Sequence, residues 1–474
     1  MGGLEDRMDK IPQRDLEIAE LLENRPLGQF QVLTLLFGCL ILFVDGLDFS
    51  APNVGAKAIQ LAFHADPSAM GMVFGWGYFG MFVGSVLLGY IGDKYGRKTG
   101  AVLGVLAYSL PAIFTIFASS IDELAVWRFL AGIGIGGVVP NTIALLTETA
   151  PKRHRVLFVM IAFVGYSLGN ASCGQIAAWL MPTYGWPVVF LAAGSTGVVL
   201  SVILVFALPE SIPFLAATKP ESPLLRRLIA RAAPEFALGP DTRIVLRRPA
   251  NETKFSLKLL FNSYRRTATP LLWIAYFADS LTFMTLSAWL TFILVEAGLP
   301  QQQAQLTFSA GAVGAMILIP LVGRGIDRFG PKVVVLFAAC AIGAILYLGM
   351  PGLTPAYVMA LAVFGYACAA ATHHSLNGIV ASFYPTIVRG NGVGYATGMG
   401  RVGAIVGPVV AGYLLSASLP LNQVLFFIAA PDLIVAACCV ALDVLRRSRS
   451  ARADFVNART TAHVKEQPAK EQPA

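Results

Sequence analysis

Long apolar segments recur along the whole chain, and they constrain its fold more than any other feature. A run of about 18–25 apolar residues is long enough to cross the hydrocarbon core of a bilayer as one helix. Because a backbone in lipid must satisfy its own hydrogen bonds, such runs predict an all-α integral membrane protein. Twelve transmembrane helices can be placed, near residues 30–52, 70–91, 100–119, 123–146, 156–181, 187–208, 270–296, 304–325, 332–350, 354–383, 392–417 and 421–444.

The composition argues against a large soluble protein. Only 13% of the 474 residues are charged and 56% are hydrophobic, whereas a soluble protein carries about 25% charged residues. The formal net charge of +8 could suggest a nucleic-acid partner. The positions of the basic residues point instead to membrane topology.

Basic residues gather in alternate loops. The loops after odd-numbered helices contain a single one, Lys57, and the two basic residues inside spans are Arg128 and Arg401. Because basic loops stay on the cytoplasmic side, we expect both termini to be cytoplasmic and the protein to be a multi-pass protein of the cell inner membrane, with no cleaved signal. The even-numbered loops carry Lys94, Arg97, Lys98, Lys152, Arg153, Arg155, Arg324, Arg328, Lys332 and Arg389.

The spans fall into two groups of six. We expect a cytoplasmic segment (1–28), an N-terminal six-helix bundle (29–208), a cytoplasmic linker (209–268), a C-terminal six-helix bundle (269–444) and a cytoplasmic tail (445–474). The linker could hold short surface helices. The tail is Arg-rich and then polar, so we expect it to be disordered.

The two groups of six are an internal repeat. The run GYIGDKYGRK (89–98) matches GRGIDRFGPK (323–332), and aligning Asp93 with Asp327 gives an offset of 327 − 93 = 234. The same offset places Asp45 on Asp279 and Arg155 on Arg389, among other matches. The chain is therefore predicted to be a duplicated six-helix unit, as is common in transporters.

Several motifs resemble one known family. GDKYGRK (92–98) resembles the signature loop of the major facilitator superfamily, RFLAGIGIGG (128–137) is similar to its fourth-helix motif, and PES (209–211) follows the sixth helix as in that superfamily. DGLD (45–48) and the stretch 384–408 resemble motifs of its aromatic acid:proton symporters. The resemblance implies a major facilitator fold with a substrate site between the halves.

Asp45 and Asp48 are the candidates for proton coupling. They are three residues apart, so they share one face of the first helix within the bilayer. Two neighbouring carboxylates in lipid cannot both be ionised cheaply, so one should hold a proton. Arg128, on the fourth helix, could meet either of them, as the resemblance implies, with Gly132 and Gly136 allowing a close helix contact. The structural alternatives are an interhelical hydrogen bond and an arginine that reaches the interface.

Arg401 is the candidate for binding a substrate carboxylate. It is expected near the bilayer midplane, where an unpaired cation is costly and a guanidinium can hold a carboxylate through two hydrogen bonds. Asp279 and Asp432 are alternative partners within the protein. Further candidate substrate contacts are His373, His374, Asn377 and Asp279, and aromatic rings that could stack on a substrate are Trp76, Tyr78, Trp289 and Tyr395.

The two glycine-bent loops are candidate cytoplasmic gates. An acidic residue within each basic loop can pair with cations or helix N-termini and hold the cytoplasmic side together. A purely topological role would need only the basic residues. The gating set is Asp93, Arg97, Glu148, Arg155, Asp327 and Arg389.

These features predict a proton-coupled secondary transporter that imports a small aromatic carboxylate of the hydroxybenzoate type by alternating access. Its partners would be that acid, protons and the lipid bilayer. We expect no metal, no cofactor, no ATP, no nucleic acid and no enzymatic activity, because no corresponding motif occurs. The alternatives are a symporter of another organic acid, an efflux antiporter, and a membrane sensor that binds the same acid without transporting it.

Overall fold

The structure is a computed structural model that describes residues 16–17, 27–232, 244–245, 257–261, 265–384 and 386–447. In this part of the chain, eleven helices are long and apolar enough to span a membrane, and a shorter apolar helix covers Lys332–Leu348. Together they account for the twelve predicted spans and confirm the all-α membrane fold. The N-terminal segment up to residue 26, apart from 16–17, and the tail from 448 lie outside the described residues.

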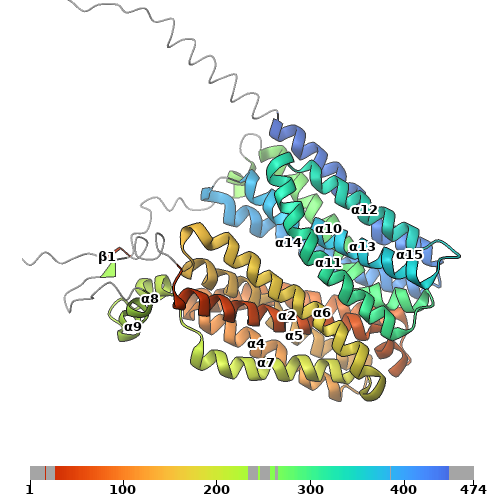
Figure 1. Ribbon diagram of the computed structural model, residues 1–474, viewed down its shortest axis with the longest axis horizontal. Helices are drawn as coiled ribbons and strands as arrows, with labels where there is room; N and C mark the ends of the chain where they lie inside the picture. The colour runs from red at the N-terminus through yellow and green to blue at the C-terminus, as the bar shows by residue number, and fades with distance from the viewer. Residues whose placement is uncertain are drawn as a thin grey trace, which may run out of the picture. The chain divides into compact units, whose positions relative to one another are not determined.

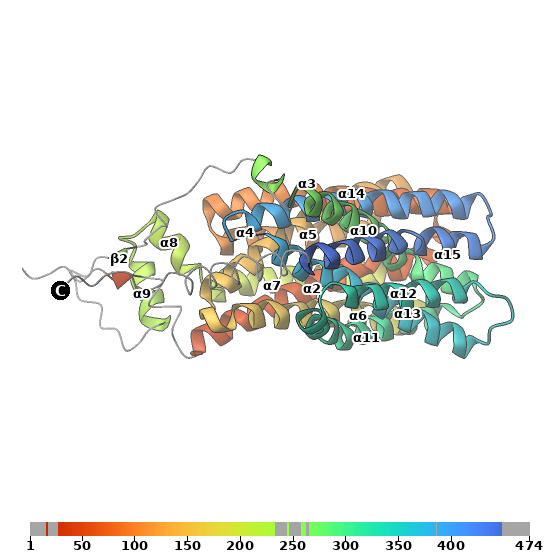
Figure 2. The same ribbon diagram turned by 90° about the horizontal axis from the view of Figure 1, so that it is seen from above.

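Within each group of six, the transmembrane helices follow one another with short connections (Figures 1 and 2). The first six are α2 (Gln29–Ala62), α3 (Pro67–Tyr95), α4 (Arg97–Phe114), α5 (Ile121–Thr149), α6 (Arg155–Tyr184) and α7 (Pro187–Ala207). The second six are α10 (Arg265–Glu296), α11 (Gln301–Phe329), α12 (Lys332–Leu348), α13 (Pro355–Phe383), α14 (Thr386–Ser416), and α15 (Leu421–Ala429) with the helical segment 431–447 that follows it.

The first helix is longer than the sequence predicted. We expected it to end near residue 52, but α2 continues through Pro52 to Ala62. Proline is tolerated inside a transmembrane helix because neighbouring helices can satisfy the backbone group that it frees. The last three turns of α2 therefore belong to the bundle rather than to a loop.

Glycines bring the helices of the first half into backbone contact. There α2 packs against α6, α3 against α5, and α4 against α5 and α7. A Cβ atom at Gly84 would lie 1.9 Å from the carbonyl oxygen of Ile133, and one at Gly136 would lie 2.0 Å from that of Met81. Side chains at these positions would force α3 and α5 apart, so the small residues fix the positions of the charged side chains on both helices.

The internal repeat is visible in helix contacts as well as in sequence. On α6, a Cβ atom at Gly169 would lie 2.0 Å from Phe43 O, and on α14 one at Gly403 would lie 2.2 Å from Phe277 O. Both members of the second contact are offset from the first by 234, since 277 − 43 = 234 and 403 − 169 = 234. The contact between α2 and α6 is therefore repeated between α10 and α14.

The described residues form two compact units. The first holds the described residues within Met1–Thr253, together with Ser287–Met316 and Pro408–Leu419. The second holds those within Lys254–Leu286, Ile317–Gly407 and Pro420–Ala474. The first unit thus contains α2–α7 and also the end of α10 and the start of α11.

The linker contains short elements. Helices α8 (Ile212–Thr218) and α9 (Pro223–Ala232) bury their apolar faces in one cluster with Phe30 at the start of α2. A short 3-10 helix spans Leu257–Phe261, and two-residue strands β1 (Leu16–Glu17) and β2 (Ile244–Val245) pair in parallel. The short helices agree with the prediction for the linker, whereas the strand pair was not foreseen.

Candidate functional site

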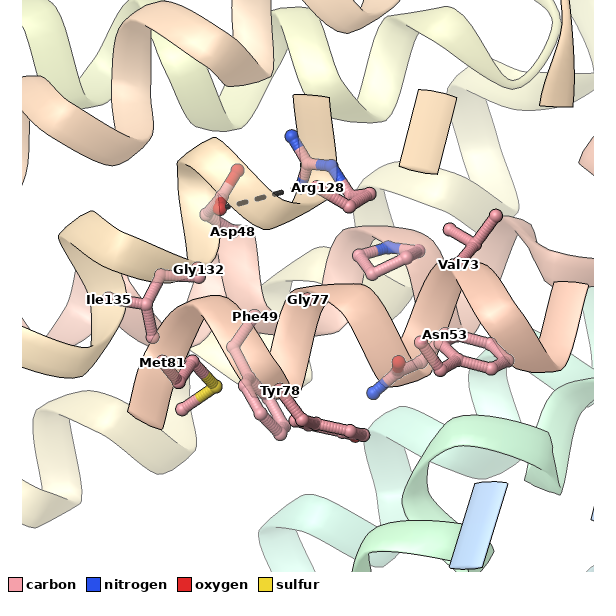
Figure 3. A pocket seen from close by; sticks show the side chains of 12 residues that line it. Asp48, Phe49, Asn53, Val73, Gly77, Tyr78, Met81, Arg128, Gly132 and Ile135 are labelled. Atoms are coloured by element: carbon pink, nitrogen blue, oxygen red, sulfur yellow. Dashed lines mark ion pairs between the residues drawn. The ribbon is translucent and has the colours of Figure 1, made fainter. Parts of the chain in front are cut away.

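The first unit contains a pocket between α2, α3 and α5. About 350 Å³ of space that no atom fills lies among its lining residues, and this figure includes space that is open to the outside of the protein. Apolar and aromatic side chains make up most of its wall, and Asp48, Asn53 and Arg128 supply its charged and amide groups. Figure 3 shows the Asp48 and Arg128 side chains directed toward each other.

Asp48 and Arg128 form a buried ion pair. Arg128 Nη1 lies 3.6 Å from Asp48 Oδ2, and the two side chains are 4% and 0% exposed. The guanidinium also donates a hydrogen bond of 3.0 Å to Thr115 Oγ1 and lies 4.7 Å from the ring centroid of Phe190. Arg128 therefore meets one of the two aspartates that were expected to face it, and it does not extend to an interface.

The ion pair is loose for two groups that are out of water. A separation of 3.6 Å exceeds the roughly 2.7–2.9 Å of a charge-assisted hydrogen bond. Thr115 and Phe190 hold the guanidinium from other directions. This geometry leaves Arg128 available to a second anion that enters the pocket.

Asp45 lies one turn before Asp48 on α2 and is also buried, at 1% exposure. The Tyr108 side chain, on α4, interacts electrostatically with the carboxylates of both aspartates. The two aspartates therefore face the inside of the α2–α7 bundle, as their spacing predicted.

Aromatic rings form one side of the pocket. Phe49 on α2 and Tyr78 on α3 (Figure 3) have ring centroids 6.0 Å apart. Phe74, which also lines the pocket, lies one turn before Tyr78 on α3. Of the four aromatic residues singled out from the sequence, Tyr78 lines this pocket. Trp289 is fully buried and donates a hydrogen bond to Pro408 O, while Trp76 and Tyr395 are exposed.

A second group of polar residues lies in the second unit. His373 Nδ1, on α13, lies 2.5 Å from Asp279 Oδ2, on α10. The His373 ring stacks on Phe283 with centroids 4.7 Å apart, and the His374 ring is 5.4 Å from that of His373. Asn377 Oδ1 accepts a 2.6 Å hydrogen bond from the hydroxyl of Tyr276. The structure thus brings Asp279, His373 and His374 together, with Asn377 one turn further along α13.

Arg401 lies half-buried on α14, in the same unit. This helix packs on α10, where a Cβ atom at Gly400 would lie 2.7 Å from Ser280 Oγ. Asp279 has His373 as its ion-pair partner. The role of Arg401 in binding a substrate carboxylate stays a prediction.

The loop after α3 forms an ion-pair network that contains three of the predicted gating residues. Arg97 pairs with Asp93, four residues earlier, and its Nε donates a 3.1 Å hydrogen bond to Glu148 Oε1 at the end of α5. Glu148 also accepts a hydrogen bond from the hydroxyl of Ser211. The loop is thereby connected to α5 and to the segment that follows α7.

Glu210 adds a further connection to the same loop. Its carboxylate accepts hydrogen bonds from the backbone N–H groups of Lys98, at 3.0 Å, and of Ser211. Burial raises the pKa of Glu210, and these N–H groups oppose the shift. This places an acidic side chain at the N-terminus of α4, where the helix dipole favours it.

The remaining gating residues are described less completely. Arg155 is the first residue of α6. Asp327 and Arg389 lie in α11 and α14, but their side chains are outside the described part of the structure. No group of three or more side chains able to hold a metal ion occurs in the described part of the chain.

Comparison with known proteins identifies the family. The model of the Major Facilitator Superfamily matches residues 38–267 and 272–470, which is most of the chain. The chain belongs to the major facilitator superfamily. The duplicated six-helix fold agrees with this assignment.

Curated relatives of this superfamily member are transport proteins. It is 32% identical to a gallate transporter of Pseudomonas putida over 88% of this chain and 92% of that protein. It is 31% identical to a benzoate transport protein of Acinetobacter baylyi, over 86% and 88% of the two chains, and 30% identical to the 4-hydroxybenzoate transporter PcaK of the same species, over 94% and 97%. The expectation of a transport protein rather than an enzyme agrees with these matches.

Solved structures support the fold alone. The chain superposes on a bacterial homologue of the human lysosomal transporter Spinster with a TM-score of 0.66 and 15% identity, over 89% of this chain and 98% of that one. It superposes on the nucleoside transporter NupG with a TM-score of 0.66 and 12% identity, over 86% and 99%.

Some pocket-lining and ion-paired residues of this superfamily member were not predicted from the sequence. Phe49 and Phe74 line the pocket, and the spacing of Phe74 and Tyr78, four residues apart on one helix, could have revealed a shared face. Lys57 forms a 2.6 Å ion pair with Glu296 within the first unit, joining α2 to the end of α10. That pair joins residues far apart in sequence, so no local sequence pattern predicts it.

Proposed function

We propose that this chain is a proton-coupled secondary transporter that imports a small aromatic carboxylate by alternating access. The observation that carries the proposal is the pocket in which aromatic rings and Arg128 meet a protonatable carboxyl, Asp48. The named substrates of the relatives, gallate, benzoate and 4-hydroxybenzoate, support an aromatic acid as the cargo. The alternation of basic loops supports an inner-membrane protein with both termini in the cytoplasm.

The ion pair gives a physical reason for coupling. Arginine keeps its charge at any ordinary pH, whereas the carboxyl of aspartate can take a proton. If Asp48 binds a proton, Arg128 loses its counter-charge in a site from which water is largely excluded. A substrate carboxylate that enters the pocket restores the charge balance, so the proton and the anion favour each other's binding.

The rings account for the aromatic part of the cargo. Phe49, Phe74 and Tyr78 present flat apolar surfaces to the same pocket that Arg128 lines. Offset-stacked or edge-to-face contacts with a substrate ring would contribute about 0.5–1.5 kcal/mol each beyond simple burial. An aliphatic acid of similar size lacks these contacts. The proton gradient supplies the driving force, and the proposal includes no cofactor.

Uptake into proteoliposomes tests the proposal. The panel contains labelled benzoates, phenylpropanoates, dicarboxylates and sugars, and an inward proton gradient is imposed or abolished. We expect accumulation of an aromatic monocarboxylate that a protonophore collapses. The proposal would be overturned by accumulation that the protonophore leaves unchanged, or by a preference for sugars or dicarboxylates. It would also be overturned by accumulation only with an opposite gradient, as in an antiporter, or by binding without uptake, as in a sensor.

A further inference from the structure

A group of three titratable residues lies inside the second unit. Asp279 comes from α10, His373 from α13 and Asp432 from the helical segment 431–447. The Asp279 carboxylate is 1% exposed and lies 2.5 Å from His373 Nδ1. The His373 side chain is 14% exposed, so it alone of the three has contact with the outside of the helix bundle.

Asp432 is the member that the sequence analysis did not assign to a site. It is 1% exposed, and neither of its carboxylate oxygens has a hydrogen-bond partner among the described residues. The helical segment 431–447 packs on α10, where Val435 and Cys439 share one apolar cluster with Tyr276, and the charges of Asp432 and Asp279 repel each other. The hydroxyl of Thr282 is beside it, but not in hydrogen-bonding geometry. A buried carboxylate without a donor is costly unless it carries a proton.

Other titratable or charged groups surround the three residues. Tyr276, on α10, donates its hydroxyl hydrogen to Asn377, and His374, on α13, stands edge-on to His373. Cys439, on the same helical segment as Asp432, interacts electrostatically with both carboxylates. Helix α14, which packs on α10, carries Arg401 and, at its start, Arg389.

The charges of the cluster favour an exchangeable proton. With a neutral imidazole and both carboxylates ionised, the cluster would place two like charges close together out of water, which is unfavourable. Two protons shared among the three groups make the cluster neutral, and one proton leaves a single negative charge. Histidine is the side chain that changes charge most readily near neutral pH, and the short contact with Asp279 lets the two share a proton.

We propose that Asp279, His373 and Asp432 form a second proton-binding site, which takes up and releases a proton during transport. The inference rests on the proposed proton-coupled function and adds a site to it. The proton enters from water at the partly exposed imidazole, is shared with Asp279, and is stabilised by the charge of Asp432. In this proposal, Asp279 and His373 bind a proton rather than the substrate.

Proton uptake by the purified protein tests this site without any transport. The pH of the protein in detergent is lowered from about 8 to about 5, the range in which histidine titrates, and the protons taken up are counted. We expect Asp432→Asn, Asp279→Asn and His373→Gln each to take up fewer protons than the wild type, by up to one per chain. Asp443→Asn is the matched control on the helix of Asp432, because Asp443 is already paired with Arg446 and Arg447. Proton uptake by this control should equal that of the wild type.

The number of protons moved per substrate, measured in proteoliposomes, completes the test. Asp432→Asn should lower this number relative to the wild type. If all three variants take up as many protons as the wild type, the second site is wrong while the proposed function stands. If the wild type transports its substrate without moving protons, the proposed function fails whatever the titration shows. Should Asp432→Asn not fold, as judged by thermal unfolding, His373→Gln decides the outcome.

Discussion

Asp48 and Asp279 are both buried, on helices that occupy equivalent places in the repeat, yet one faces an arginine and the other a histidine. The offset of 234 places Ala362 where the first half has Arg128, since 128 + 234 = 362. It places Val139 where the second half has His373, since 373 − 234 = 139. The helix contacts were kept after duplication, whereas the charges were placed independently.

The difference between the two partners has physical consequences. Arg128 is a permanent charge, so the state of its site changes only when Asp48 takes a proton or another anion arrives. His373 can lose its charge, so its site can change state through either partner. The first half is therefore suited to binding a proton and an anion together, and the second half to holding a variable number of protons.

The largest expected effect is a loss of substrate accumulation when the buried aspartates of the first half are changed. We expect Asp48→Asn and Asp45→Asn to abolish concentrative uptake, because neither amide can carry the coupling proton. Asp48→Asn should still bind the acid, since Arg128 then lacks its competing carboxylate. Uptake under a proton gradient, compared with exchange of substrate at equilibrium, measures both properties. Undiminished accumulation in both variants would remove these residues from the coupling mechanism.

The next largest expected effect is a difference between the two halves in how much a substitution lowers the stability of the folded protein. Asp48→Leu leaves Arg128 as a buried charge that cannot be neutralised, and we expect a cost of about 3–5 kcal/mol. Asp279→Leu should cost less, because His373 can become neutral. Thermal unfolding of the purified proteins measures the difference, and Asp122→Asn, a change of an exposed acid, is the control. If Asp48→Leu/Arg128→Leu is no more stable than Asp48→Leu, the arginine is not the source of the cost.

The two arginines can be compared through the carboxylate of the substrate. The sequence predicts that Arg401 holds it, whereas the pocket geometry favours Arg128. Changing the arginine that binds the carboxylate to Ala should weaken the protein's preference for the acid over its neutral amide. The expected loss is about 1.5–3 kcal/mol, or roughly ten- to a hundred-fold. Substitution by Lys should lose less, because the charge remains while the two-pronged geometry is lost.

Binding of the acid and of the amide to the purified variants decides between the arginines. If Arg128→Ala loses the preference and Arg401→Ala keeps it, the carboxylate lies in the pocket of the first unit. The reverse result would place it at Arg401.

The smallest expected effect concerns the two repeat-equivalent loops that contain Asp93 and Asp327. Asp93 pairs with Arg97, which in turn holds Glu148. Asp93→Asn should slow turnover while equilibrium affinity stays within a few-fold, because the network holds a gate and not the substrate. Asp327→Asn should act in the same way if the second loop is equivalent. Rates of uptake and binding in detergent separate the two properties, and a large loss of affinity with intact folding would contradict a gating role.

Much of the architecture could be predicted from the sequence. Apolar runs set the number of spans, because a helix must be long enough to cross the bilayer. The offset between Asp93 and Asp327 revealed the duplication, and the three-residue spacing of Asp45 and Asp48 placed both on one face of α2. These properties depend on local order along the chain, which sequence records directly.

Pairing between distant residues was decided by tertiary structure. The sequence left Arg128 with two possible partners, and the packing of α5 placed it against Asp48, Thr115 and Phe190. It gave no sign that Asp279 would meet a histidine, and the fold brought His373 Nδ1 to 2.5 Å from its carboxylate. Which side chains meet depends on the rotation and depth of each helix, and these are fixed by contacts such as Gly136 on Met81 that join residues far apart in the chain.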